Sequence, residues 1–320
     1  MSKLRPIRLP VVALVSTVAL VACASEDDVS VPATSSASTS APAASAPAAA
    51  SAPAASAPAA SAGSSVPTID HPRGADQTVV ELAEAGGIGP EGSDFASPPS
   101  VLVLGDGTVI RPGPQIQVYP GPMLPALTTA QIDEPALQRL LAQADAEGLL
   151  TSPPPAYDEP PGTPQVADAP ATTLELDAGG DRNGPVVHQA YGLVTGGGES
   201  TPARQRLARF VAVLRGLRSG AGGLSAEARY QPLRFGVIAR AATAEERAPS
   251  DEGVAPAVLP WPAAAGRLAD SHGRCVEVPA SAVGPSLEGA KATDRFSQDG
   301  TTYVVFVRVL LPGEACSQFS

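Results

Sequence analysis

The hydrophobic and polar positions take on the periods of regular secondary structure from about residue 67 onward. Residues 78–82 form the first short apolar run that reads as a strand. Two further runs, 100–104 and 108–110, are separated by Gly105-Asp106-Gly107. Because a short glycine-containing turn between apolar runs is typical of a β-hairpin, we expect these two segments to pair.

A helical period follows this hairpin over residues 128–148. Thr128 or Thr129 can cap its first turn through the side-chain hydroxyl, and Gly148 can end it in the left-handed conformation. We therefore expect one amphipathic helix here, with its apolar face toward a core. The residues on that face are Leu137, Leu140, Leu141 and Ala144.

The same order of elements recurs further along the chain. Residues 172–177 and 186–191 flank a polar turn and predict a second hairpin, and residues 202–217 predict a second helix with Thr201 as its cap. Two hairpins, each followed by a helix, indicate an α+β fold in which two helices pack on a largely antiparallel sheet. Tandem hairpin-helix units are one reading of this pattern. The apolar positions of the second helix are Leu207, Phe210, Val211 and Leu214.

The composition changes near residue 223, which is a candidate sub-boundary within a folded region of residues 67–320. Residues 233–239 predict a strand, whereas residues 243–266 are rich in proline, alanine and charge and predict surface loops. Residues 301–310 form the strongest strand pattern of the chain. Their nearly continuous apolar character predicts a central position in a sheet.

The N-terminus has the order of an export signal. Lys3, Arg5 and Arg8 precede an uncharged apolar run, residues 9–21, which is shorter than the ~20 residues that cross a membrane. The tetrapeptide Leu20-Val21-Ala22-Cys23 resembles the lipobox of bacterial lipoproteins. This resemblance implies that residues 1–22 are removed and that the thiol of Cys23 carries a diacylglyceryl group on the extracytoplasmic face of the cell membrane. The alternative is an ordinary secretory signal with a chance cysteine.

A segment that repeats Ser-Ala-Pro-Ala-Ala fills most of residues 23–66. Its regularly spaced prolines block helical turns, and it offers no large apolar side chains for a core. We expect a disordered tether, at most about 140 Å long when extended, that separates the lipid anchor from the folded region. Glycosylation of its serines and threonines is an alternative role.

Charge and composition narrow the class of partner. Lys3 and Lys291 are the only lysines among 21 basic residues, and the formal charge of −11 falls to −14 without the three cations of the signal. An acidic surface argues against binding to nucleic acid, because phosphate contacts need cations. With its arginine, alanine and proline bias, its lipobox and its hairpin-helix pattern, the chain resembles uncharacterised secreted lipoproteins of actinobacteria.

Two cysteines remain once Cys23 is acylated. Cys275 and Cys316 form an even pair in an oxidising compartment, so we expect a disulfide that pins the end of the last strand to residues 275–278. Two separate buried thiols are the alternative.

Candidate catalytic groups are scattered. His71, His188 and His272 have no carboxylates or cysteines at metal-ligand spacing, and the standard hydrolase signatures are missing from the sequence. Asp106 and Asp299 lie in glycine-containing turns, where aspartate usually serves turn geometry. We therefore assign no catalytic, cofactor-binding or metal-binding residue.

Two aromatic residues flanked by proline are candidate contacts for a partner. Tyr119 precedes Pro120-Gly121-Pro122, and Trp261 lies between two prolines; the alternative for each is a ring packed over the core beneath a rigid loop. The sequence predicts a non-catalytic, membrane-tethered extracytoplasmic domain that binds an envelope protein or a cell-wall component. An envelope hydrolase with an unrecognised site and a capture protein for a small ligand are the alternatives.

Overall fold

Two β-sheets organise the part of the chain that the computed structural model describes, which is residues 68–159, 162, 168–179, 184–193, 201–218, 223–249 and 253–319. All of these residues belong to one structural unit, Ala62–Ser320. The signal, Cys23 and the whole tether region, residues 23–66, lie outside the described residues. No helix within the described ranges is both long enough and apolar enough to cross a membrane.

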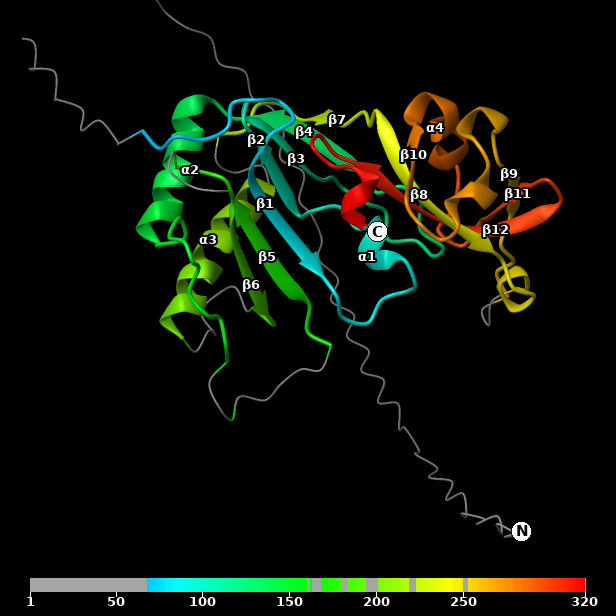
Figure 1. Ribbon diagram of the computed structural model, residues 1–320, viewed down its shortest axis with the longest axis horizontal. Helices are drawn as coiled ribbons and strands as arrows, with labels where there is room; N and C mark the ends of the chain where they lie inside the picture. Colours follow the sequence, from blue (N-terminus) through cyan, green and yellow to red (C-terminus); the bar gives the residue numbers. More distant parts are fainter. Residues whose placement is uncertain are drawn as a thin grey trace, which may run out of the picture. The chain divides into compact units, whose positions relative to one another are not determined.

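The first sheet has seven strands in the order β6-β5-β1-β2-β3-β4-β7, and each neighbouring pair is antiparallel. Both expected hairpins are present, as β2–β3 and β5–β6. Strand β1 lies between them and joins them into one sheet (Figure 1). The bounds are β1 Thr78–Ala85, β2 Val101–Leu104, β3 Thr108–Pro112, β4 Leu127–Gln131, β5 Ala171–Leu176, β6 Val186–Tyr191 and β7 Ala228–Arg229.

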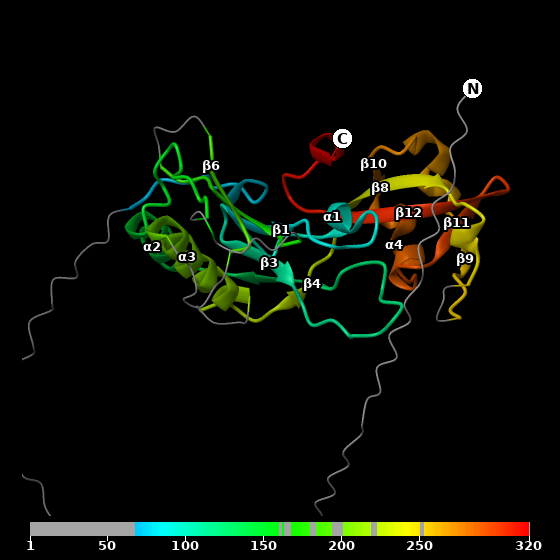
Figure 2. The ribbon, with the colours of Figure 1, turned by 90° about the horizontal axis from the view of Figure 1, so that it is seen from below.

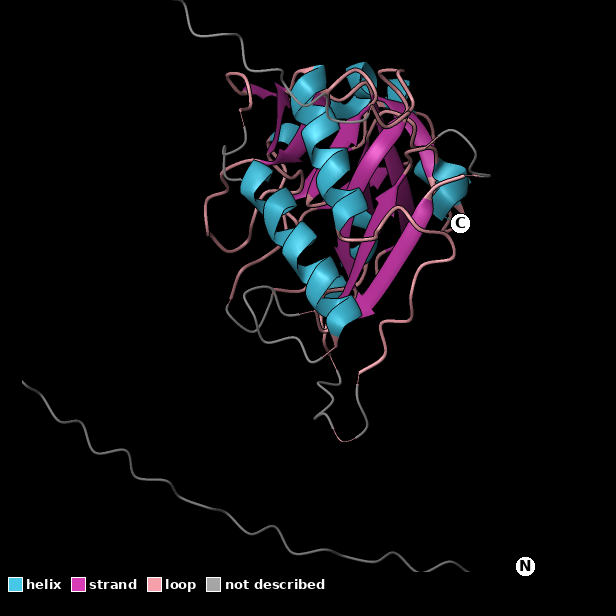
Figure 3. Ribbon diagram, turned by 90° about the vertical axis from the view of Figure 1, so that its left-hand side faces the viewer, coloured by secondary structure: helices cyan, strands magenta, loops and turns pink. Residues whose placement is uncertain are grey.

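Helices α2 (Glu134–Ala146) and α3 (Pro202–Arg218) cover one face of this sheet (Figure 3). The apolar stripes expected for both helices are buried in a core with side chains of β1, β2 and β5. Thr201 caps α3 as expected, since its hydroxyl accepts a hydrogen bond from the backbone N–H of Arg204 at 3.3 Å. The α+β prediction is confirmed.

The start of the first long helix was wrongly predicted. Thr128 and Thr129 belong to strand β4, where they pair with residues of β3, and the helix begins six residues later. Its cap is Asp133, whose carboxylate accepts from the N–H of Ala136 at 2.8 Å. Sheet pairing holds the β-branched threonines in an extended backbone. Gly148 follows the helix with φ 71°, in the left-handed conformation expected there.

The second sheet has five strands in the order β10-β8-β12-β11-β9, with β9 and β11 parallel and the other pairs antiparallel. Strand β12 is central, as its apolar sequence predicts. Helix α4 (Ala280–Glu288) contributes side chains to the hydrophobic core of this second sheet. The strand bounds are β8 Arg234–Ala241, β9 Val258–Pro260, β10 Val276–Pro279, β11 Arg295–Gln298 and β12 Thr301–Leu310.

Strand β2 contributes to two cores at once. Val101 and Val103 lie in the core beneath α2 and α3, whereas Leu102 and Leu104 lie in the core of the second sheet. A strand buried on both faces has a continuous apolar sequence, which explains the run Val-Leu-Val-Leu. Short helical turns complete the described structure: α1 Ser93–Ala96, η1 Glu245–Arg247, η2 Ala263–Ala265, η3 Leu268–Ser271 and η4 Cys316–Phe319.

Candidate functional site

The histidine on the second hairpin is part of a buried structural network. His188 is fully buried, with Nε2 at 2.8 Å from the carbonyl oxygen of Leu149 and Nδ1 at 2.7 Å from the hydroxyl of Tyr157. Since a carbonyl can only accept, Nε2 carries the proton and Nδ1 accepts from Tyr157. Burial lowers the pKa of His188 against the opposing effect of the Leu149 hydrogen bond, and burial raises the pKa of Tyr157 to about 12. Both groups are therefore neutral at physiological pH.

A buried arginine strengthens the same region. The guanidinium of Arg204, which is 2% exposed, donates to the carbonyl oxygens of Tyr157, Tyr191 and Gly192 at 3.0 to 3.1 Å. It thereby ties the segment after α2 to the end of β6 and to α3. The side chains of His188 and Arg204 are buried, and their hydrogen bonds connect three parts of the fold.

The remaining polar residues singled out in the sequence are spread over separate turns. His71 lies in a loop beside Glu134, with Nε2 and Oε1 3.2 Å apart, and His272 lies in a turn with φ 47°. Asp106 accepts from the N–H of Thr108 at 2.9 Å, which is the turn role expected of it, and Asp299 has φ 52°. The described ranges contain no group of three or more His, Cys, Asp or Glu that could hold a metal ion.

The carboxyl group of Glu81 has a strongly raised pKa. Glu81 on β1 pairs across the sheet with Glu175 on β5, on the face opposite to α2 and α3. Burial, followed by the negative charges of Glu314 and Glu175, raises the pKa of Glu81 to about 7, and only the charge of Arg308 acts in the opposite direction. Glu81 therefore changes its charge near neutral pH.

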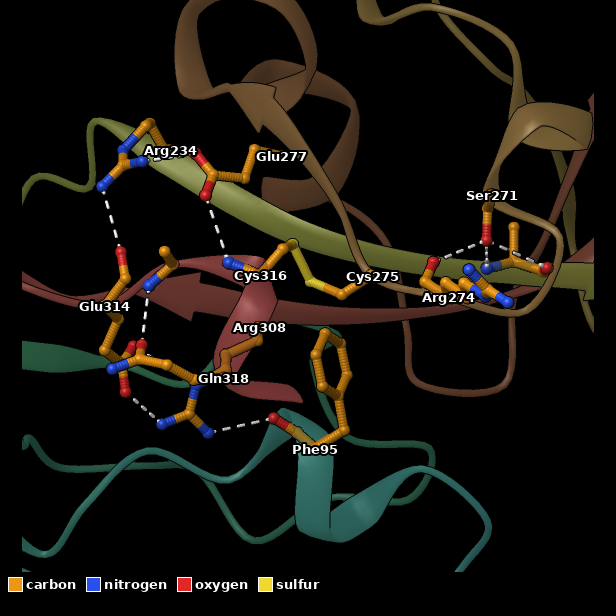
Figure 4. Close-up of a disulfide and its surroundings, with 12 residues drawn as sticks. Phe95, Arg234, Ser271, Arg274, Cys275, Glu277, Arg308, Glu314, Cys316 and Gln318 are labelled. Carbon is orange, nitrogen blue, oxygen red and sulfur yellow. Dashed lines mark hydrogen bonds and ion pairs between the residues drawn. A yellow bond between two sulfur atoms is a disulfide. The ribbon is translucent and has the colours of Figure 1, made fainter. Parts of the chain in front are cut away.

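The expected disulfide joins Cys275 and Cys316, whose Cα atoms are 5.2 Å apart (Figure 4). It fixes the segment after β12 to the start of β10, as predicted. Gly236 on β8 makes room for it, since a Cβ there would lie 2.8 Å from the sulfur of Cys275. The N–H of Cys316 also donates to Glu277 at 3.1 Å.

Arg308 connects the same C-terminal segment to the region of α1. Its guanidinium pairs with Glu314 and donates to the carbonyl oxygen of Phe95 at 3.1 Å (Figure 4). It also donates to the carbonyl oxygen of Ser97 at 2.7 Å. Arg308 also lies 4.4 Å from the ring centre of Phe319. The disulfide and the contacts of Arg308 thus hold the C-terminal segment against the rest of the fold.

The connection between β3 and β4 carries three exposed large apolar side chains within four residues. Figure 2 shows this loop leaving the end of β3 and returning to β4. Within it, Ile116 is 79%, Val118 50% and Tyr119 64% exposed. The sequence carries no charge from Pro112 to Ile132. Adjacent exposed apolar side chains without charges are typical of an interaction site.

Backbone hydrogen bonds hold the base of this loop in place. The N–H of Met123 donates to the carbonyl oxygen of Ala290, and the N–H of Ala292 donates to that of Gly121, each at 2.9 Å. Pro122 and Lys291 form an isolated antiparallel bridge beside these bonds. The apolar tip, defined as Ile116, Val118 and Tyr119, therefore projects from a fixed base.

The structure separates the two aromatic residues that the sequence proposes as partner contacts. Tyr119 is exposed, in agreement with that reading, but Trp261 is only 6% exposed. Its ring lies 5.3 Å from that of Phe296 in an edge-to-face arrangement, and its Nε1 donates to the carbonyl oxygen of Gly266 at 3.1 Å. The partner role for Trp261 is corrected: it is the ring packed over the core, because its flanking loop folds onto the second sheet.

Sequence reasoning missed Ile116 and Val118. The signal that points to them is the uncharged stretch around Tyr119, in which two aliphatic residues alternate with glutamines instead of charged residues. The loop also forms one wall of a groove, through Leu124 and Pro125.

No protein-family model matches the chain, and no curated protein or solved structure is significantly similar to it. The apolar tip and the groove at the base of its loop are the features from which a function can be argued.

Proposed function

We propose that this chain is a lipoprotein, anchored to the extracytoplasmic face of a bacterial cell membrane through Cys23, whose folded region binds an envelope protein. The observation that carries the proposal is the apolar tip: three adjacent exposed side chains on a loop whose base is fixed by hydrogen bonds to residues 290–292. Cell-wall glycans offer few apolar groups to such a tip, which favours a protein over a cell-wall component as the partner.

Export is supported by two independent features. Leu20-Val21-Ala22-Cys23 has the lipobox pattern, and Cys275 and Cys316 form a disulfide. Disulfides persist in oxidising compartments and are rare in the cytosol, so the bridge fits a location outside the membrane. Two acyl chains on Cys23 would bind the bilayer stably, because each buried methylene contributes ~0.8 kcal/mol.

Binding is favoured over turnover by the roles of the polar residues. In the described part of the chain the histidine that contacts a hydroxyl is His188, and both it and Tyr157 are enclosed. A hydrolase would need a nucleophile and a base in contact at an accessible surface. The apolar tip, in contrast, offers surface without reactive groups.

The fixed base of the loop gives the tip a physical advantage. A loop that is already ordered loses little conformational entropy when a partner binds, so more of the apolar burial remains as affinity. The tether adds a second effect, since anchoring raises the concentration of the tip near membrane-bound partners. The role we infer is that of a binding module held at a distance from the bilayer.

The test is a comparison of two surface patches in a binding assay. Soluble chain, in which an ordinary cleavable secretory signal replaces residues 1–23, is exported, cross-linked to cells and recovered with its partners. The tip variant Ile116→Ser/Val118→Ser should lose a specific partner, because it removes exposed apolar surface. The control variant Val187→Ser/Tyr191→Ser, which changes two exposed residues of β6, should retain it. Equal recovery by the tip variant and wild type would refute the proposal.

A further inference from the structure

We propose that the groove at the base of the loop is a second binding site, which takes a small uncharged amphipathic molecule. The groove has a volume of about 270 Å³ and lies between the β4–β7 edge of the first sheet, strand β8 and helix α4. Its walls therefore come from both sheets. It is distinct from the apolar tip, although the same loop contributes to both.

The floor of the groove is apolar and rigid. Leu124 and Leu127 line it from the loop and β4, and Phe235 and Val309 line it from the second sheet. Phe235 is only 1% exposed and belongs to the second core, so its ring is held by packing on the side away from the groove. An apolar ligand body placed on this floor would leave water itself and would cover Leu124, which is partly exposed.

A glycine keeps the groove open on the side of α4. Gly284 lines the groove, and a Cβ placed there would lie 4.0 Å from Cε2 of Phe235. An alanine would just touch the ring, whereas a larger side chain at this position would extend into the volume above the floor. The missing side chain at residue 284 is therefore what leaves room for a ligand.

Uncharged polar groups also line the groove. Tyr230, Gln231 and Ser281 present a hydroxyl, an amide and a second hydroxyl. Burial raises the pKa of Tyr230, as does the charge of Glu314, while Arg234 lowers it, so the phenol stays protonated at neutral pH. Its hydroxyl has no hydrogen-bond partner among the described residues, which leaves it able to bind a polar group of a ligand.

The charges at the rim cancel each other. Arg229 and Glu288 both line the groove and form an ion pair, with a nitrogen and an oxygen 3.2 Å apart. A charged ligand would therefore find one attractive and one repulsive neighbour. Uncharged polar groups beside an apolar floor match an uncharged molecule with a hydroxyl or amide head and an aromatic or alicyclic body.

The experiment uses a pair of fluorescent probes that share their rings and differ in charge. N-phenyl-1-naphthylamine is uncharged, and 8-anilino-1-naphthalenesulfonate carries an added sulfonate. With the soluble chain from residue 24 onward, free of detergent, the uncharged probe should bind saturably at one site per chain. The sulfonate should bind at least tenfold more weakly, because the rim offers it no unpaired cation.

Two matched glycine variants locate the site. Gly284→Leu should weaken the uncharged probe at least tenfold, whereas Gly289→Leu should leave its affinity within twofold of wild type. Gly289 ends the same helix, and a Cβ there would meet nothing within 4 Å. Ser281→Phe fills the groove from one turn earlier and gives the same expected loss, in case Gly284→Leu does not fold.

Several results would overturn the inference. They are unchanged probe affinity in a folded groove-filling variant, an equal loss in Gly289→Leu, or equal binding of the two probes. The tip variant Ile116→Ser/Val118→Ser should bind the uncharged probe as wild type does. A result against the groove as a ligand site can thus be distinguished from a result against the apolar tip as a partner site.

Discussion

Replacing Glu81 by glutamine should stabilise the protein above neutral pH. Glu81 is on strand β1, between β5 and β2 in the first sheet, and the charges of Glu175, Glu314 and Arg308 act on its carboxyl. Its pKa of about 7 compares with 4.5 for an ordinary glutamate. Folding therefore favours the protonated form, and the ionised form is held in the sheet at a cost in free energy.

The pH dependence of the protein's stability follows from the difference between these two pKa values. Because the folded pKa is raised, the contribution of Glu81 to stability is fully present below pH 4.5 and is lost as pH rises through about 7. Each pKa unit corresponds to about 1.4 kcal/mol, so the full loss of unfolding free energy is about 3 kcal/mol. Glu81 keeps partial contact with solvent, so we expect about 2 kcal/mol. Glutamine has nearly the same shape and no charge, and avoids this loss.

The assay is urea unfolding of wild type and Glu81→Gln at pH 8 and pH 4. The variant should be more stable by about 2 kcal/mol at pH 8 and nearly equal at pH 4. Glu84→Gln is the control, since Glu84 lies on the same strand and pairs with Arg215 of α3. It should give no gain at pH 8. A Glu81→Gln variant that is no more stable than wild type at pH 8, or equally stabilised at both pH values, would refute the reasoning.

Four other predictions concern the anchor, the disulfide, the buried histidine and the tyrosine bonded to it. Cys23→Ala should abolish labelling by a radioactive fatty acid, and continued labelling would contradict the lipid assignment. Cys275 and Cys316 should resist alkylation in the unreduced protein, and the double serine variant should lose about 4 kcal/mol of unfolding free energy in urea, because the bridge closes a long loop. The pKa of His188 is below 6.5, so stability should fall as pH drops below that value, and His188→Gln should flatten this slope in thermal melts. Tyr157→Phe should cost about 1 kcal/mol by removing one hydrogen bond, and an unchanged melting temperature would count against that bond.

Much of the fold can be predicted from local patterns, and the errors arise where distant pairing decides. The helix stripes and hairpins depend on residues a few positions apart, so their periods are visible in the sequence. Thr128 and Thr129 have the residue type of a helix cap, but they extend the sheet because β3 lies beside them. The residues next to Thr128 and Thr129 in the sequence do not reveal that β3 will pair with them.

The candidate site was less predictable for the same reason. Tyr119 and Trp261 have similar proline-rich surroundings in the sequence, yet one is exposed and the other is in a core, because only the second sheet provides Phe296 as a neighbour for the indole. The pKa of Glu81 depends on Glu314, which the fold brings from the far end of the chain. Local sequence indicates neither environment.

The most direct test of the binding role is photo-crosslinking on living cells from two matched tyrosine positions. Tyr119 and Tyr191 are 64% and 63% exposed, on the apolar tip and on β6 respectively. A photoreactive amino acid at position 119 should give a discrete adduct with one envelope protein, and the same group at position 191 should not. Adding excess soluble wild-type chain should suppress the adduct, whereas the Ile116→Ser/Val118→Ser chain should not. No adduct at position 119, or the same adducts at both positions, would contradict the proposal that the tip binds a partner.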